Sequence, residues 1–164
     1  MTKRYTSIEI AKEYLHFSAA HFTIFSATER ERLHGHNFFV AAKVKSEIGP
    51  NGLCFDYNEL KDKLRTLCEQ YDEYMLIPAD SPYLKVSEDQ QHYQVEFNKE
   101  TLKYPKSDCL LLPVLNISVE ELSRFLLSEL VKDKKAMHSM KLEEIELKVS
   151  SGPGQWGIAN WSRA

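Results

Sequence analysis

Three histidines carry the residue types and spacing in this chain that most clearly suggest chemistry. His34 and His36 flank Gly35, and His21 lies on the segment before them. On an extended strand, alternate residues point to the same side, so the rings of His34 and His36 would project together. Gly35 would let the backbone be approached closely. If the segment of His21 forms a hairpin with this strand, a third imidazole nitrogen would lie across from the pair.

Three neutral imidazoles that leave a fourth position open describe a catalytic zinc site, whose open position can bind and polarise substrate oxygens. A closed structural zinc site would usually include cysteines, and none lies near these histidines in the sequence. The spacing alone leaves open the alternative that they are surface or hydrogen-bonded side chains. The remaining histidines have no other candidate metal ligands at a similar spacing and are interpreted as ordinary polar residues: His16, His92 and His138.

The elements that would position these histidines are two strands and the loop between them. Residues 5–25 are interpreted as one long strand, and residues 36–46 alternate as a second strand. We expect them to form a hairpin connected by the charged residues 28–32. A turn at residues 50–52 precedes a helix with Asp56 as N-cap and Glu59 in a capping box, which should end near Tyr71.

The second half of the chain predicts an insertion, a helix and two strands. Residues 80–107 indicate a small hairpin whose turn lies at residues 87–91. A second helix should start at Ser118, with a capping box through Glu121, and residues 144–149 alternate as a half-buried strand. Residues 156–161 close the chain as a short strand. The order predicts an α+β fold in which two helices cover one face of a four-stranded antiparallel sheet. The other face should still carry apolar residues and meet another subunit.

Composition places the chain among ordinary globular proteins. Its 164 residues suit one domain, residues 1–164, and the net charge of −3 indicates neither nucleic acid nor an anionic membrane as a partner. The three cysteines argue against a disulfide framework, and no apolar run is long enough to span a bilayer. The N-terminus contains no apolar signal segment, so we expect a cytoplasmic protein.

Several of these segments resemble the 6-pyruvoyl-tetrahydropterin synthase family, which also includes 6-carboxytetrahydropterin synthase. Residues 17–21 (Phe-Ser-Ala-Ala-His) followed by residues 33–38 (Leu-His-Gly-His-Asn-Phe) are similar to its signature. The helix starts at residues 54–60 and 118–122 are similar to its Asp-Phe-x-x-Leu and Thr-Ser-Glu-Asn-Leu stretches. The resemblance covers nearly the whole chain.

The resemblance implies the T-fold, whose subunits form trimers, or hexamers of two stacked trimers, with active sites between subunits. It implies His21, His34 and His36 as ligands of Zn²⁺. It also implies a lyase acting on the pterin 7,8-dihydroneopterin triphosphate, with zinc polarising side-chain oxygens of the substrate and a protein base moving protons on the adjacent carbon.

Departures from the family pattern occur around the base. Most members carry a catalytic cysteine four residues before the first histidine of His-Gly-His, where this chain has Arg30. One subclass carries instead a glutamate three residues before that histidine, and Glu31 matches it. That subclass releases the folate precursor 6-hydroxymethyl-7,8-dihydropterin. It also contains an Asp-Cys-x-x-Leu-Pro stretch, which residues 108–113 resemble.

Other site residues are assigned by the same resemblance. The family's proton-relay motif Leu-Asp-His corresponds to Tyr71-Asp72-Glu73, so Asp72 and Glu73 are candidate catalytic residues. Ser118, Ser151 and Gln155 are candidate substrate contacts. Ser151 stands where the family anchors the pterin ring through a glutamate, and a serine cannot replace a bidentate carboxylate. The alternatives are a T-fold relative with an altered substrate or a non-catalytic homologue that retains zinc.

Overall fold

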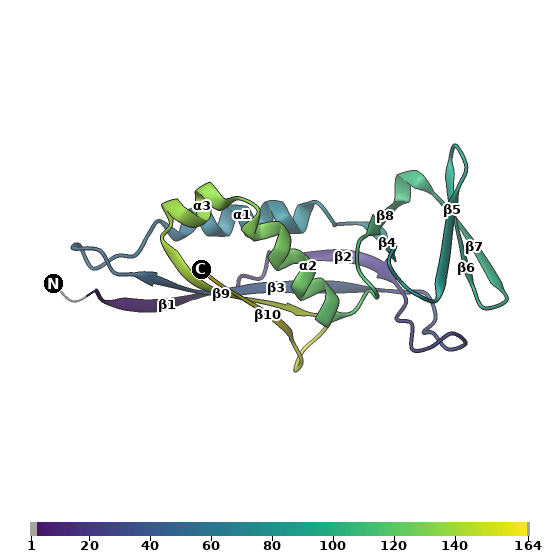
Figure 1. Ribbon diagram of the computed structural model, residues 1–164, viewed down its shortest axis with the longest axis horizontal. Coiled ribbons are helices and arrows are strands. Elements are labelled where there is room, and N and C mark those ends of the chain that lie inside the picture. Colours follow the sequence, from purple (N-terminus) through teal and green to yellow (C-terminus); the bar gives the residue numbers. More distant parts are fainter. Residues whose placement is uncertain (1–2, 164) are drawn as a thin grey trace.

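A fourteen-residue strand, β3 (His34–Glu47), is the central element of the main sheet in the computed structural model, which describes residues 3–163. One side of β3 pairs antiparallel with β2 (His16–His21) along its first half and with β1 (Tyr5–Ile10) along its second half. Its other side pairs with β9 (Leu142–Ser150), which is followed by β10 (Gly157–Ser162). These strands are the antiparallel part of the predicted α+β fold (Figure 1).

The prediction of one long strand over residues 5–25 was wrong, because this segment forms two separate strands, β1 and β2. The chain turns between β1 and β2, where the amide of Leu15 donates to the carbonyl of Lys12 at 3.0 Å. Leu15 is fully buried by this turn. Beyond His21 the chain leaves the sheet, and only an isolated bridge joins Ile24 to Arg30. The turn that buries Leu15 therefore divides the predicted strand into two.

The main sheet is larger than the four strands predicted. Its order is β10-β9-β3-β2-β4-β8, because β4 (Tyr74–Pro78) pairs parallel with β2 and β8 (Cys109–Leu112) pairs parallel with β4. Four consecutive residues of β4, Met75 to Pro78, are buried. A short strand buried on both faces shows no alternation, and periodicity cannot distinguish it from other apolar segments.

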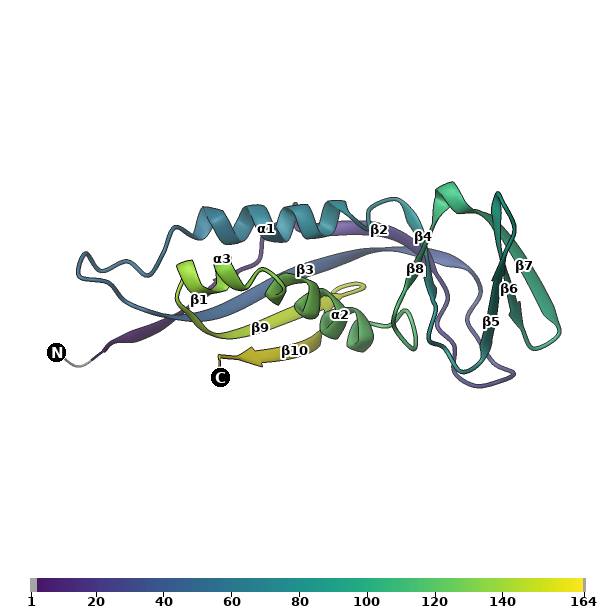
Figure 2. The same ribbon diagram turned by 45° about the horizontal axis from the view of Figure 1, so that its top comes forward.

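Three helices lie over one face of the main sheet (Figure 2): α1 (Tyr57–Glu69), α2 (Val119–Val131) and the short α3 (Lys134–Ser139), which the sequence did not predict. Both predicted N-caps are confirmed. The side chain of Ser118 accepts from the amide of Glu121, whereas that of Asp56 accepts from Asn58 rather than Glu59. Leucines of α1 and α2 pack onto the inward residues of β3 and β9 in the largest core cluster.

The opposite face of the antiparallel strands is mostly charged and exposes only Phe39 and Ile158 as large apolar residues of β3, β9 and β10, so the prediction that it carries apolar residues holds only in part. Lys148 pairs with Glu9 at 2.6 Å and with Glu146 at 3.4 Å, and Lys45 pairs with Glu144 at 2.6 Å. These residues occupy the outward positions between buried apolar ones on the same strands. The predicted alternation of residues 144–149 is confirmed, with the apolar residues buried and the charged ones outward.

The insertion is a three-stranded sheet rather than a two-stranded hairpin: β5 (Leu84–Glu88), β6 (His92–Phe97) and β7 (Glu100–Pro105), followed by the 3-10 turn η1 (Lys106–Asp108). It lies at one end of the elongated molecule (Figure 1). A second core cluster, which includes Phe22, Met75, Ile77 and Phe97, joins it to β4 and the loop after β2. Among the described residues, no helix is both long and apolar enough to cross a membrane.

Candidate metal centre

The three predicted histidines converge at one end of the main core, next to the start of α2. His21 and His34 are direct partners in the pairing of β2 with β3, and His36 is on the same face of β3. The ring centroid of His21 lies 4.6 Å from that of His34 and 5.2 Å from that of His36. One nitrogen of each ring lies within 4.8 Å of the others. The strand register alone therefore brings the cluster together, as predicted.

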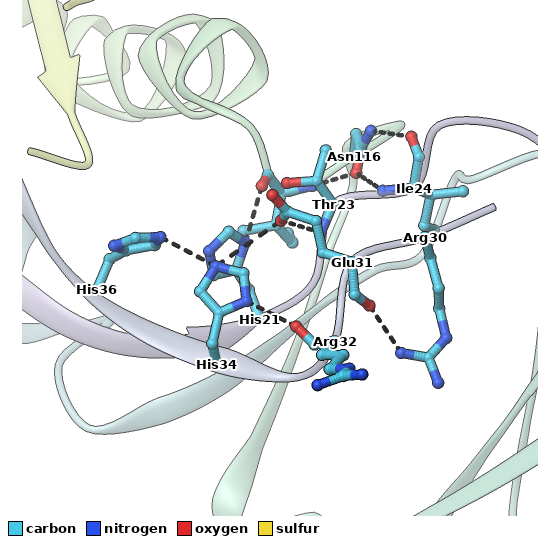
Figure 3. Close-up of polar contacts among 10 residues, drawn as sticks. His21, Thr23, Ile24, Arg30, Glu31, Arg32, His34, His36 and Asn116 are labelled. Carbon is cyan, nitrogen blue, oxygen red and sulfur yellow. Dashed lines mark hydrogen bonds and ion pairs between the residues drawn. The ribbon is translucent and has the colours of Figure 1, made fainter.

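Backbone carbonyls orient two of the rings (Figure 3). Nδ1 of His21 donates to the carbonyl of Ile117 at 3.0 Å, and Nδ1 of His34 donates to the carbonyl of Arg32 at 2.6 Å. These bonds assign the proton to Nδ1 and leave Nε2 of both rings with a free lone pair. Nε2 of His34 lies 3.0 Å from Nε2 of His36.

The cluster fits a metal ion. Nε2 of His21 is buried and has no hydrogen-bond partner among the described residues, which is costly for a polar atom unless a ligand satisfies it. Burial, reinforced by the neighbouring His34 and His36, lowers the pKa of His21 to about 4, so its ring is neutral near pH 7. His21 is 4% exposed, whereas the side chain of His34 is 35% exposed. The ligand set is therefore closed on one side and open on the other.

Glu31 lies beside this cluster, on the loop between β2 and β3. Its Oε2 is 3.7 Å from Nε2 of His34 and accepts the amide of Thr23 at 3.0 Å. Burial raises the pKa of Glu31, but hydrogen bonds from Thr23 and the proximity of His34 outweigh it and hold the pKa below its usual range. The carboxylate is therefore ionised and fixed next to the three nitrogens, as a proton acceptor near a metal would need to be.

Asp72 and Glu73 occupy the turn before β4, on the other side of β2. Asp72 accepts the amide of Ser18 at 2.7 Å, and the amide of Glu73 donates to the carbonyl of Ser18 at 2.7 Å. Glu73 adopts a left-handed conformation with φ of 64°. No hydrogen bond or ion pair joins either carboxylate to the histidines within residues 3–163. Their catalytic role stays a prediction.

The three candidate substrate contacts are dispersed around the start of α2 and the β9–β10 turn. Ser118 is the N-cap of α2, which occupies its side-chain oxygen. Ser151 is half-buried in the turn after β9, and Gln155 is exposed in the same turn. These assignments also stay predictions.

Sequence reasoning missed the residues that hold the loop around Glu31. The side chain of Asn116 accepts the amide of Ile24 at 3.1 Å and donates to its carbonyl at 2.8 Å. The contacts from Thr23 and Ile117 to the site are made by backbone atoms. Backbone donors and acceptors leave no signal in residue identity, and nothing in the sequence joins Asn116 to a loop so far away.

Comparisons with known proteins agree with this architecture. A sequence model of the family described as 6-pyruvoyl tetrahydropterin synthase matches residues 9–159. A relative from Methanocaldococcus jannaschii, described as "Putative 6-carboxy-5,6,7,8-tetrahydropterin synthase", is 22% identical over 142 residues, which cover 86% of each chain. A Pyrococcus abyssi protein of the same description is 22% identical over 138 residues, covering 84% of this chain and 80% of its own.

Solved structures of 6-pyruvoyl tetrahydropterin synthase superpose over almost the whole chain. The Plasmodium vivax protein gives a TM-score of 0.92 at 26% identity and covers 98% of this chain and 99% of its own. The Plasmodium falciparum protein gives 0.91 at 27% identity, with coverage of 97% and 99%. The predicted T-fold is thus confirmed. This chain belongs to the 6-pyruvoyl tetrahydropterin synthase family, whose members are lyases of pterin synthesis.

Proposed function

We propose that this chain is a zinc-dependent lyase that acts on 7,8-dihydroneopterin triphosphate. The metal ligands are His21, His34 and His36, and Glu31 is the general base. The observation that carries the proposal is the convergence of three ring nitrogens within 4.8 Å of one another, beside a carboxylate oxygen 3.7 Å from one of them. Three imidazoles with an open side are the ligand set of catalytic zinc sites.

The chain's own residues supply binding and proton transfer in this proposal. When bound, zinc would polarise the hydroxyl or carbonyl oxygens of the substrate side chain. His21 and His34 present Nε2 because backbone carbonyls hold their Nδ1 protons. Glu31 is ionised and held by Thr23, so it can accept a proton from the carbon next to a polarised oxygen.

The substrate class follows from the relatives. The curated proteins are named for 6-carboxytetrahydropterin synthesis and the solved ones for 6-pyruvoyl tetrahydropterin synthesis. Variants of the P. vivax protein are described as replacing a glutamate that is a catalytic residue. Glu31, in a chain without the usual cysteine, supports a glutamate base here as well, with 6-hydroxymethyl-7,8-dihydropterin as the product.

Further parts of the proposal concern the remaining residues and the assembly. Asp72 and Glu73 would relay protons, and Ser118, Ser151 and Gln155 would contact the substrate. We propose a cytoplasmic homo-oligomer of one domain per chain, a trimer or hexamer, in which Asp72 and Glu73 serve a neighbouring copy. This accounts for their separation from the histidines of their own chain.

A second candidate is an enzyme of the same family with a changed ring pocket. The turn at residues 151–155 offers Ser151 and Gln155 but no carboxylate to accept hydrogen bonds from an amino-pyrimidine edge. This observation favours a substrate whose ring differs from a standard pterin. A homologue that retains zinc without turnover is the remaining alternative.

The deciding experiment combines metal analysis with product identification. We expect about one zinc per purified chain, loss of that zinc in His34→Ala, and conversion of 7,8-dihydroneopterin triphosphate detected by mass. Glu31→Gln should retain zinc and lose at least about a hundredfold in kcat, because the amide cannot accept the proton.

The matched control for the ligands is His16→Ala. His16 begins the same strand as His21, but its Nδ1 contacts the carbonyl of Glu13 and its ring packs on Phe39. This variant should keep both zinc and turnover. Zinc-free wild-type protein would reject the metal site, and an unchanged kcat in Glu31→Gln would remove Glu31 from the reaction. A zinc-loaded protein that is inactive on this substrate would favour one of the alternatives.

A further inference from the structure

Arg30 lies next to the proposed base, but its side chain turns away from the metal site. It occupies the position where the resemblance places a cysteine in most family members. Its side chain is only 15% exposed and reaches the small sheet instead. Nε and Nη2 donate to one carboxylate oxygen of Glu100, the first residue of β7, at 2.9 and 2.7 Å. In Figure 3, Arg30 and the histidines lie on opposite sides of Glu31.

Two aromatic rings hold the same guanidinium. Its central carbon lies 4.8 Å from the ring centroid of Phe22, directly after β2, and 5.8 Å from that of Phe97, at the end of β6. Both rings belong to the second core cluster. A planar guanidinium suits such stacking together with hydrogen bonds in its plane, which a lysine ammonium does not. The position of Arg30 is therefore fixed by both the main sheet and the small sheet.

A third donor of Arg30 connects this contact to the metal site. Nη1 donates to the backbone carbonyl of Glu31 at 2.8 Å. The next carbonyl along the chain, that of Arg32, accepts Nδ1 of His34 at 2.6 Å. The amide of Glu31 donates to the carbonyl of Thr23 at 2.8 Å, and the Glu31 carboxylate accepts the amide of Thr23. A continuous series of contacts thus runs from Glu100 through Arg30 to Glu31 and His34.

We propose that Arg30, anchored by Glu100, is a positioning residue that holds the 22–33 loop so that Glu31 and His34 keep their geometry. The small sheet would then contribute to the geometry of the active centre, because its residue Glu100 anchors Arg30. The consequence for turnover rests on the proposed function; the effect on the loop does not.

A role in stability alone makes a different prediction. The ion pair is open to solvent on its Glu100 side, where the side chain is 55% exposed against 15% for Arg30, and a pair that reaches solvent contributes little to folding. Removing the carboxylate charge should therefore leave the melting temperature nearly unchanged. Small displacements of catalytic groups, in contrast, can cost about a hundredfold in rate. Turnover and loop order therefore separate positioning from stability.

The test compares Glu100→Gln, Arg30→Lys, Arg30→Gln and the double variant Arg30→Gln/Glu100→Gln. The control is Glu88→Gln, which removes another ion pair of the small sheet, that of Glu88 with Lys106 at 2.6 Å. Each variant is characterised by its melting temperature, by amide hydrogen exchange over residues 22–33, and by kcat and KM with 7,8-dihydroneopterin triphosphate.

We expect exchange in the loop to accelerate about tenfold or more in the Arg30 and Glu100 variants and to stay unchanged in Glu88→Gln. The value of kcat should fall about 10- to 100-fold with KM within about threefold, because substrate binding is not the step affected. Arg30→Lys should recover only part of kcat. The double variant should be no worse than Arg30→Gln, since both changes break one series of contacts.

The outcomes distinguish this proposal from the proposed function. Unchanged loop exchange in Arg30→Gln, or accelerated exchange with unchanged kcat, would overturn the positioning role. If the wild-type protein does not convert the substrate, the proposed function fails. The positioning role of Arg30 is then tested by loop exchange and by the zinc content of Arg30→Gln, which do not depend on turnover. Equal effects in Glu88→Gln would reduce the observation to general loosening of the small sheet and overturn the proposal.

Discussion

At the scale of single residues, the environment of each group decides its chemistry more than its type does. His21 becomes a ligand candidate because Nδ1 is bound to a carbonyl while Nε2 is buried without a partner. Glu31 is ionised because hydrogen bonds from Thr23 outweigh its burial. Cys109 belongs to a stretch that resembles a family motif, yet its own surroundings suppress its reactivity.

The cysteines provide a direct test of these environments. Burial raises the pKa of Cys68 to about 12, and burial with nearby Asp108 raises that of Cys109 to about 11. The thiolate is the reactive form, so neither should react with an aromatic disulfide reagent near pH 8. We expect Cys54, which is half-buried, to account for the fast-reacting thiol of the native protein, and all three to react after denaturation. A Cys54→Ser variant that still shows a fast thiol would contradict this.

Asp89 predicts an acid-sensitive turn in the small sheet. Its carboxylate accepts the amides of Gln91 and His92 at 2.8 and 2.7 Å and lies 2.9 Å from Nζ of Lys103. Lys103 first, and then these amides, hold the pKa of Asp89 below its ordinary value of 3.8. A lowered folded-state pKa gives stability that is present above the unfolded value and lost as the pH falls through the folded one.

We therefore expect amide exchange in β5 and β6, corrected for its intrinsic pH dependence, to speed up as the pH falls below about 4. The Asp89→Asn variant should lack this component, because the amide does not titrate in that range. The measurement is exchange over residues 84–97 at about pH 5 and pH 3 in both proteins. Identical pH dependence in the two would show that Asp89 does not stabilise the turn.

At the scale of elements, the histidine cluster depends on close packing between the start of the edge strand β10 and the start of α2. β10 begins at Gly157, where an added Cβ would lie 2.2 Å from the carbonyl oxygen of Val119 and 2.4 Å from its carbon. Those atoms belong to the first residue of α2. The carbonyl of Ile117, two residues before Val119, orients His21. Packing at Gly157 and the orientation of the candidate ligand His21 are therefore linked through the start of α2.

Gly157→Ala should destabilise the protein by about 2 kcal/mol or more, because neither backbone can move without disturbing the sheet or the helix. The control is Gly152→Ala in the adjacent turn, where an added Cβ meets nothing within 4 Å and φ is not positive. That variant should stay within about 0.5 kcal/mol of wild type. Urea unfolding of the three proteins measures the difference, and equal midpoints would refute the packing argument.

At the scale of the whole molecule, the sheet has a helix-covered face, a mostly charged face and open edges. β10 and β8 end the strand order within the described residues, and each has an exposed apolar residue, Ile158 at 50% and Leu111 at 37%. Open edges invite pairing with another chain unless they are covered. The open edges, with the exposed apolar residues that they carry, therefore support the proposed association of copies.

We expect light scattering after size exclusion to give three or six times the mass of one chain. Ile158→Asp should weaken the assembly, because it places a charge beside the edge strand β10. The control is Leu53→Asp, which changes a side chain that is 64% exposed on the turn before α1. A monomeric wild-type protein would reject the proposed assembly, and an intact oligomer in Ile158→Asp would exclude this edge as the contact.

The sequence by itself determined the histidine cluster proposed to bind metal, both main helix starts and the α+β class, because these depend on local rules. Alternation sets His34 and His36 on one face, and capping side chains define where α1 and α2 begin. The similarity to a known family added the glutamate position.

The tertiary structure alone decided what depends on contacts between distant segments. β4 became a strand of the main sheet through burial of four consecutive residues, β8 joined the sheet by pairing with β4, and Leu15 divided the predicted first strand. The orientation of His21 by Ile117 and the contact of Arg30 with Glu100 join residues far apart in the chain. Such contacts depend on how whole elements pack, which residue type and local spacing do not encode.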